Sequence, residues 1–116
     1  MRVDHFRFGS IRVDGVTYEN DLLIDRGRVR KRKKKRSKAF RDEFGHTPLS
    51  VEETIPWKCQ TLIVGTGAEG ALPVMPEVVL EANRRHVDLV VVPTAQAIDL
   101  LNQKPSKANA ILHVTC

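Results

Sequence analysis

The 116-residue sequence has only two cysteines, Cys59 and Cys116, and it has no apolar run of even half the length of a membrane span. Two distant cysteines make neither a disulfide-rich scaffold nor a zinc site, because zinc ligands come in closely spaced pairs. The short apolar runs exclude a transmembrane helix. The residues that follow Met1 lack the apolar stretch of a secretory signal. We therefore expect a cytoplasmic protein with no membrane partner.

The sequence also lacks a recognisable catalytic constellation. Its four histidines are scattered, and none has metal-ligand spacing with a cysteine or a carboxylate. His113 lies inside an apolar run, which favours a core histidine with satisfied ring nitrogens over a functional one. No serine lies in a nucleophile-elbow context. We expect a protein that is not an enzyme, with no catalytic residues, no metal site and no cofactor.

Positive charge is concentrated in one segment that contains no acidic residue. The rest of the chain carries ten basic and fourteen acidic groups. The nine cations of the basic segment are Arg28, Arg30, Lys31, Arg32, Lys33, Lys34, Lys35, Arg36 and Lys38. No aromatic residue lies among them to stack on bases, so we expect a solvated segment and no sequence-reading element. Nonspecific binding of nucleic-acid phosphates is the alternative.

The length fits a single domain, residues 1–116, whose first part is β-like. Residues 1–36 favour a β meander that ends in the basic segment, expected as an edge strand followed by a loop. Asp14-Gly15 separates two short β-like runs and predicts a hairpin turn, because both residues tolerate a positive φ. Ser50 and Glu53 have the spacing of a capping box and predict a short helix.

Residues 57–116 alternate strands with helices. Continuous apolar runs at 61–64, 89–92 and 110–114 are rich in β-branched residues and indicate strands buried on both faces. Residues 76–86 and 95–103, which lie between them, have helical periodicity. The result is a β-α-β-α-β half attached to the meander, and we predict an α/β fold.

A G-x-G-x-x-G string, Gly65 to Gly70, directly follows the first buried strand. In dinucleotide-binding folds the helix begins within this motif, but here Pro73 and Pro76 delay it. The next strand ends without a carboxylate for a ribose hydroxyl. The string therefore indicates a crossover loop rather than a nicotinamide or flavin site.

A candidate ligand site lies where the carboxyl ends of two parallel strands should meet. Glycines there let the backbone approach a ligand, and the helix that starts at threonine favours a carboxylate or a phosphate. The alternative is that these residues only let the chain turn, with Leu72 or Met75 filling the space. The candidate residues are Gly65, Thr66, Gly67, Pro93 and Thr94.

Four segments together resemble one family of uncharacterised small domains. They are Phe8–Tyr18, Gln60–Gly67, Val92–Ala97 and His113–Cys116. The family includes the adipogenesis-associated cytoplasmic domain protein and mitochondrial NADH dehydrogenase (complex I) assembly factor three. The resemblance covers nearly the whole chain. It implies three layers, (β+α)/β/α, around a mixed five-stranded sheet whose last strand is antiparallel to its neighbours.

The resemblance implies no established catalytic residue or cofactor, and it connects eukaryotic members with protein assembly. We expect a non-enzymatic protein-interaction or complex-assembly module with a protein partner. The alternatives are a binder of a small anionic ligand at the crevice by Gly67 and Thr94, and a nonspecific nucleic-acid binder. If the last strand runs antiparallel to the strand that begins at Thr61, Cys59 and Cys116 become neighbours and candidates for a disulfide. A reducing cytoplasm would keep them as thiols.

Overall fold

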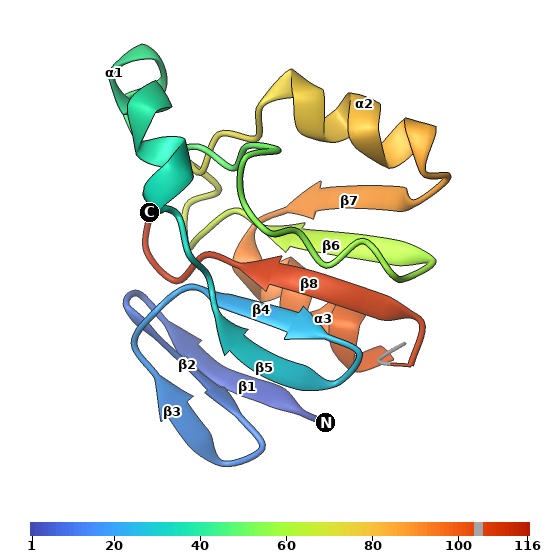
Figure 1. The fold of residues 1–116 in the computed structure, drawn as a ribbon. Helices are drawn as coiled ribbons and strands as arrows, with labels where there is room; N and C mark the ends of the chain where they lie inside the picture. The colour runs from blue at the N-terminus through green and yellow to red at the C-terminus, as the bar shows by residue number, and fades with distance from the viewer. Residues whose placement is uncertain (104–105) are drawn as a thin grey trace.

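The computed structural model describes residues 1–103 and 106–116. Figure 1 shows two β-sheets with helices around them. The strands are β1 (Val3–Arg7), β2 (Ser10–Val13), β3 (Val16–Tyr18), β4 (Leu22–Asp25), β5 (Arg28–Lys31), β6 (Thr61–Gly65), β7 (Asp88–Val92) and β8 (Ala108–Leu112). The helical elements are the 3-10 helix η1 (Lys35–Phe40), α1 (Arg41–Phe44), α2 (Pro76–Arg84) and α3 (Thr94–Gln103).

The central sheet is mixed and has the strand order β5-β4-β8-β6-β7. Strand β6 is parallel to β7 and to β8, whereas β4 is antiparallel to β5 and to β8. The mixed five-stranded sheet is thus confirmed. The last strand, β8, was expected to run antiparallel to both of its neighbours. It is antiparallel to β4 but parallel to β6, so the expectation is correct for β4 and wrong for β6. Helix α3 connects β7 to β8 as a crossover, and a crossover returns the chain in the parallel direction.

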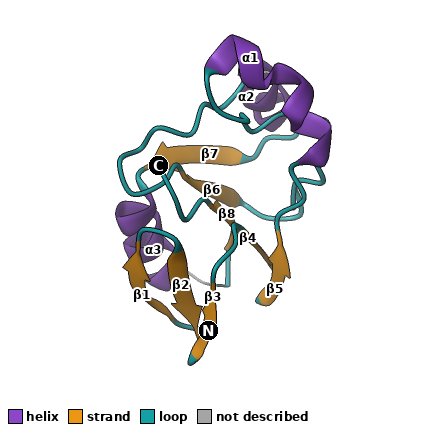
Figure 2. Cartoon of the chain, turned by 90° about the vertical axis from the view of Figure 1, so that its left-hand side faces the viewer, coloured by secondary structure: helices purple, strands orange, loops and turns teal. Residues whose placement is uncertain are grey.

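The central sheet is the middle of three layers. Residues that alternate along β4 point to opposite faces: Leu22 and Ile24 pack with α3 and the small sheet β1-β2-β3, whereas Leu23 packs with Val78 of α2. Figure 2 shows α3 and the small sheet on one side of the central sheet and α2 on the other. This arrangement confirms the predicted (β+α)/β/α layers, because both faces of the sheet are apolar and need a cover.

The β2-β3 turn is as predicted, with Asp14 at φ 48° and Gly15 at φ 82°. Two other expectations for the first half differ from the structure. Strands β4 and β5 leave the meander and join the central sheet, because the three consecutive apolar residues of β4 are buried on both faces. Ser50–Glu53 forms a turn and not a helix, since Glu53 bonds to a distant arginine and not to a capping partner.

Candidate functional site

The predicted ligand site is assembled but closed. Strands β6 and β7 are parallel, so their carboxyl ends meet at one edge as expected. Thr94 is fully buried there, and its hydroxyl donates to the carbonyl of His113 (2.6 Å) and accepts from the N–H of Gly67 (2.8 Å). The Thr66 hydroxyl donates to the carbonyl of Val92 at 3.1 Å. The hydroxyls that were expected to face a ligand therefore bond within the protein.

Residues 113–116, which follow β8, fill the space beside this edge. A Cβ placed on Gly67 would lie 2.3 Å from the carbonyl oxygen of Thr115 and 2.4 Å from the carbonyl carbon of Cys116. Gly67 therefore admits the protein's own backbone in place of a ligand. Leu72 is also buried, as its loop folds back over Thr66. The prediction of an anion site at Gly65, Thr66, Gly67, Pro93 and Thr94 is wrong for this physical reason.

The two cysteines are free thiols, and the prediction of a disulfide is also wrong. Because β6 and β8 are parallel, Cys59 precedes the amino end of β6, whereas Cys116 follows the carboxyl end of β8. The two residues therefore lie at opposite ends of the sheet.

A buried ionic network lies where the basic segment leaves β5. Arg32 is 4% exposed, and its guanidinium binds both carboxylate oxygens of Glu53, at 2.7 and 2.8 Å. The same group donates to Asp21 at 2.9 Å and to the carbonyl of Pro48 at 3.2 Å. A buried arginine requires such partners, because an unpaired charge in the protein interior is strongly destabilising. Arg32 is thus a structural residue and not part of the solvated charge.

Two serines complete the network. The Ser37 hydroxyl of η1 donates to Glu53 at 2.5 Å, and its oxygen lies 2.6 Å from the Ser50 hydroxyl oxygen. We define the Arg32 network as Asp21, Arg32, Ser37, Ser50 and Glu53. It joins η1 and the turn at 50–53 to the end of β5.

Asp21 connects the Arg32 network to a second group of polar side chains. Its Oδ2 lies 2.7 Å from His113 Nδ1, and its Oδ1 accepts the N–H of Val114 at 3.0 Å. Burial by itself would raise the pKa of Asp21, but the hydrogen bonds from His113 and Val114 and the charge of Arg32 lower it to about 2. Asp21 is therefore a carboxylate at neutral pH.

The other ring nitrogen of His113, Nε2, lies 2.8 Å from Cys116 Sγ. The hydrogen-bonded series Asp21–His113–Cys116 thus joins a carboxylate, an imidazole and a thiol, which is the order found in nucleophilic cysteine sites. The expectation that His113 is a core residue with satisfied nitrogens holds for its burial, at 5% exposure. The grouping itself was missed, because Asp21 comes from the other end of the chain. The only local signal was the His113-x-x-Cys116 spacing.

The basic segment forms one edge of the central sheet. Strand β5 pairs with β4 alone and ends the strand order. Eight of the nine cations are exposed, Arg32 being the exception. Val29 packs partly into the core and anchors the strand. The expected edge strand is present, and the expected loop contains η1.

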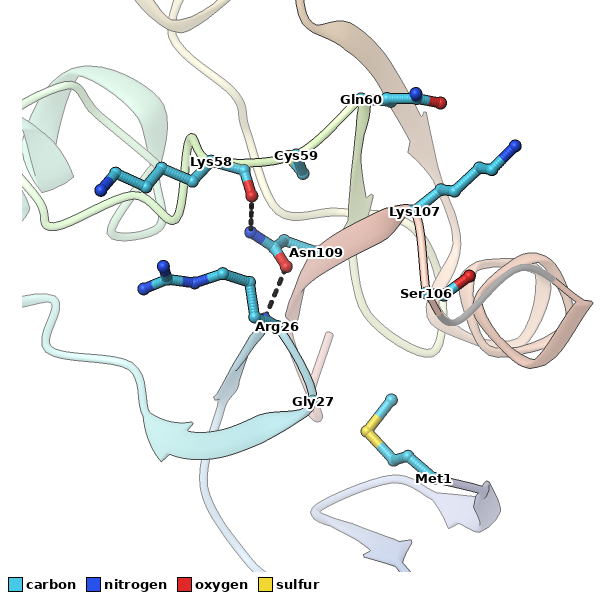
Figure 3. Close-up of a pocket in the computed structure, with 9 residues that line it drawn as sticks. All are labelled: Met1, Arg26, Gly27, Lys58, Cys59, Gln60, Ser106, Lys107 and Asn109. Carbon is cyan, nitrogen blue, oxygen red and sulfur yellow. Dashed lines mark hydrogen bonds between the residues drawn. The ribbon is translucent and has the colours of Figure 1, made fainter.

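A surface cavity of about 580 Å³ lies at the amino ends of β6 and β8. Figure 3 shows that its cationic side chains do not converge, since Lys107 points away from Arg26 and Lys58. The Asn109 side chain beneath them is already bonded, to the N–H of Arg26 and to the carbonyl of Lys58. The described residues that line this cavity therefore lack the convergent polar groups of a built binding site.

Within residues 1–103 and 106–116, no helix is long and apolar enough to cross a membrane. The same described ranges hold no group of three or more His, Cys, Asp or Glu residues arranged to bind a metal ion.

The three layers and the mixed sheet define a small α/β protein with a buried polar network. The carboxyl ends of β6 and β7 are covered by the protein's own residues 113–116. The chain belongs to the DUF498/DUF598 family of proteins of unknown function, whose model matches residues 3–113. No curated protein matches the chain.

Several solved structures are similar. A conserved hypothetical protein, PH1505 from Pyrococcus horikoshii OT3, is 28% identical over 100% of both chains, with a TM-score of 0.83. A protein called MT938 is 27% identical over 99% of this chain and 98% of its own, with a TM-score of 0.72. An outer membrane protein from Bartonella henselae is 13% identical over 98% and 94% of the two chains, with a TM-score of 0.66, and shares the fold alone.

Proposed function

We propose that this protein is a non-enzymatic interaction module that binds an acidic, extended polypeptide segment along β5. One observation carries the proposal: β5 is an edge strand whose exposed side chains are cationic. An edge strand presents unpaired backbone N–H and C=O groups, which an incoming strand satisfies. The surrounding cations select a partner of opposite charge and raise its rate of association.

The same charges weigh against two other partners. A second copy of this chain would bring its own cations to the edge, and like charges oppose such pairing. A nucleic acid would use the cations but not the backbone groups of β5, and the segment offers no aromatic side chain for base stacking. An acidic strand uses both features.

The Arg32 network holds the end of β5 in place, and this order also favours a binding role. Arg32, held by Glu53 and Asp21, fixes the end of β5, and its N–H donates to the carbonyl of Asp21 at 2.8 Å. A fixed edge loses less conformational entropy on binding than a mobile tail does. The resemblance to the family that includes complex I assembly factor three supports a role in complex assembly.

The proposal is tested with a fluorescent ten-residue peptide of alternating Glu and Val, at about 0.15 M salt, where weak surface attractions are screened. Binding is measured by fluorescence anisotropy. The control peptide carries an N-methyl group on every backbone nitrogen, which keeps the charge but removes the backbone donors on both edges of the strand. We expect the first peptide to bind at least about tenfold more tightly, because only it can extend the sheet.

A variant pair locates the site. R28Q/R30Q/K31Q removes three cations from β5, and R7Q/K58Q/K107Q removes three exposed cations elsewhere. Both variants have the same net charge, and only the first should weaken peptide binding. Equal losses in both would show unspecific charge attraction and refute the site. Stronger binding of a matched oligothymidylate than of the peptide would favour the nucleic-acid alternative.

A further inference from the structure

A second feature of the molecule, independent of the proposed function, concerns Cys116. Its Sγ lies 2.8 Å from His113 Nε2, and His113 Nδ1 lies 2.7 Å from Asp21 Oδ2. Asp21 precedes β4, whereas the other two residues follow β8, so the fold brings distant segments together to form the series. The Thr115 hydroxyl oxygen also lies 3.2 Å from the same Nε2.

The carboxylate fixes the role of each ring nitrogen. The low pKa of Asp21, about 2, keeps it ionised and able only to accept hydrogen bonds at neutral pH. His113 Nδ1 must therefore carry a hydrogen, since it faces this carboxylate. In the neutral imidazole the lone pair is then on Nε2, which faces the thiol. Nε2 is thus oriented to accept the thiol proton, as the base does in other cysteine sites.

Asp21 links His113 to the buried ion pairs of the Arg32 network. His113 Nδ1 and Arg32 Nη1 both lie within hydrogen-bond distance of Asp21 Oδ2, at 2.7 and 2.9 Å, and the Arg32 guanidinium is also held by Glu53. The carboxylate that orients the imidazole is therefore itself held in place by a buried cation.

Cys116 and His113 differ in their exposure to solvent. His113 is 5% exposed and Asp21 is 9% exposed, whereas Cys116 is only partly buried. Cys116 is thus the most exposed residue of the series, while the imidazole and the carboxylate are shielded from water. Reactive cysteines are typically partly exposed in this way.

Cys59, the other cysteine of the chain, has different surroundings and serves as a comparison for Cys116. Cys59 Sγ donates weakly to the carbonyls of Pro56 and Trp57, at 3.6 and 3.8 Å. Burial raises the pKa of its thiol. No histidine is among its hydrogen-bond partners in the described part of the chain. Cys59 is thus partly buried as Cys116 is, but it lacks the base.

We propose that Cys116 is a site of covalent modification by low-molecular-weight disulfides, with His113 as its base and Asp21 as the residue that positions His113. His113 Nε2 takes the thiol proton, and the Cys116 thiolate attacks one sulfur of the disulfide. A new sulfur–sulfur bond forms between Cys116 and that half as the original one breaks. The other half leaves as a thiolate and takes the proton from His113, so that one thiol replaces another.

The test compares single-cysteine chains, C59S for Cys116 and C116S for Cys59. The probe is dithiodipyridine, a neutral aromatic disulfide whose released thione is followed by absorbance. Each rate is measured in the folded chain and again in urea. At pH 6.5 we expect folded Cys116 to react at least about tenfold faster than it does in urea, and Cys59 to react more slowly when folded than in urea. Folded Cys116 that reacts no faster than unfolded Cys116 would overturn the proposal.

The pH profile tests His113 directly. An ordinary thiol loses about tenfold in thiolate for each pH unit below about 8.5, whereas the C59S chain should lose much less of its rate than this between pH 8 and 6, because His113 takes the thiol proton. C59S/H113Q should regain the tenfold dependence, and C59S/H46Q, which changes an exposed histidine elsewhere, should not. A folded H113Q chain with an unchanged profile would exclude the base. If H113Q does not fold, the comparison of folded and unfolded C59S still decides the proposal.

Discussion

The hydroxyl of Thr94, at the start of α3, donates a hydrogen bond of 2.6 Å to the carbonyl of His113. It also accepts the N–H of Gly67 at 2.8 Å. One buried side chain thus joins the loop after β6, the start of α3 and the segment after β8. A position expected to bind a ligand instead holds three pieces of the chain together.

Replacement of Thr94 by valine keeps the volume but removes both hydrogen bonds. It leaves the N–H of Gly67 and the carbonyl of His113 without their partner in a buried place. We expect a loss of about 1–3 kcal/mol in the free energy of unfolding, measured by urea denaturation. The control T17V changes an exposed threonine and should stay within about 0.5 kcal/mol of the parent. An equal effect in both variants would contradict the role assigned to Thr94.

Gly67 tests the approach of residues 113–116 to the loop after β6. G67A combines a positive φ of 105° with a Cβ that meets the backbone of Thr115. G9A has a similar φ, 89°, but open space around its Cβ. Both variants bear the strain of a left-handed alanine, about 1 kcal/mol. We expect G67A to be less stable than G9A by at least about 1 kcal/mol, from the extra clash alone. Equal thermal stabilities would show that residues 113–116 do not lie there.

Arg32 tests the buried ionic network. R32M leaves the carboxylates of Glu53 and Asp21 buried without their cation, and we expect a loss of about 3–5 kcal/mol in the free energy of unfolding. K33M removes an exposed cation from the next position and should change stability by less than about 0.5 kcal/mol. A small effect of R32M would mean that Arg32 is solvated as its neighbours are.

Asp21 gives the protein a predictable response to acid. Folding lowers its pKa from 3.8 to about 2, so the carboxylate is favoured in the folded state. Its contribution, about 2 kcal/mol, is therefore present above pH 4 and is lost as the pH falls from about 4 to 2. Urea denaturation of the parent should show this loss, and D21N should show a shallower slope in that interval. Parallel slopes would contradict the prediction.

The sequence predicted the layers better than it predicted the sites. The apolar runs at 61–64 and 110–114 gave β6 and β8, because strands buried on both faces need continuous apolar residues. The run at 89–92 gave β7, but the expectation of burial on both faces is wrong there, since β7 is an edge strand and Val91 is exposed. Strand direction followed from the helical crossover for β6 and β7. The direction of β8 came from the family resemblance instead, and the disulfide prediction failed with it. No local sequence signal predicts that β8 lies between β4 and β6, because this position depends on pairing between distant segments of the chain.

The candidate sites depended on contacts between distant parts of the chain. Glycines at a strand end fit a ligand or a neighbouring backbone equally well, and only the path of residues 113–116 distinguishes the two. In the sequence nothing distinguishes Arg32 from the eight other cations of the basic segment, because its partner Glu53 lies 21 positions further along the chain. Asp21 and His113 are 92 positions apart. Pairs such as these are visible only once the fold is known.

Amide hydrogen exchange on the β5 edge tests the proposed function most directly. The alternating Glu-Val peptide is added at about 0.15 M salt, and protection is compared for the two edge strands of the central sheet, β5 and β7. If the peptide extends the sheet at the cationic edge, amides of Arg28–Lys31 exchange more slowly and those of Asp88–Val92 do not change. Unchanged exchange in β5 under saturating peptide, or protection at β7 instead, would contradict the account.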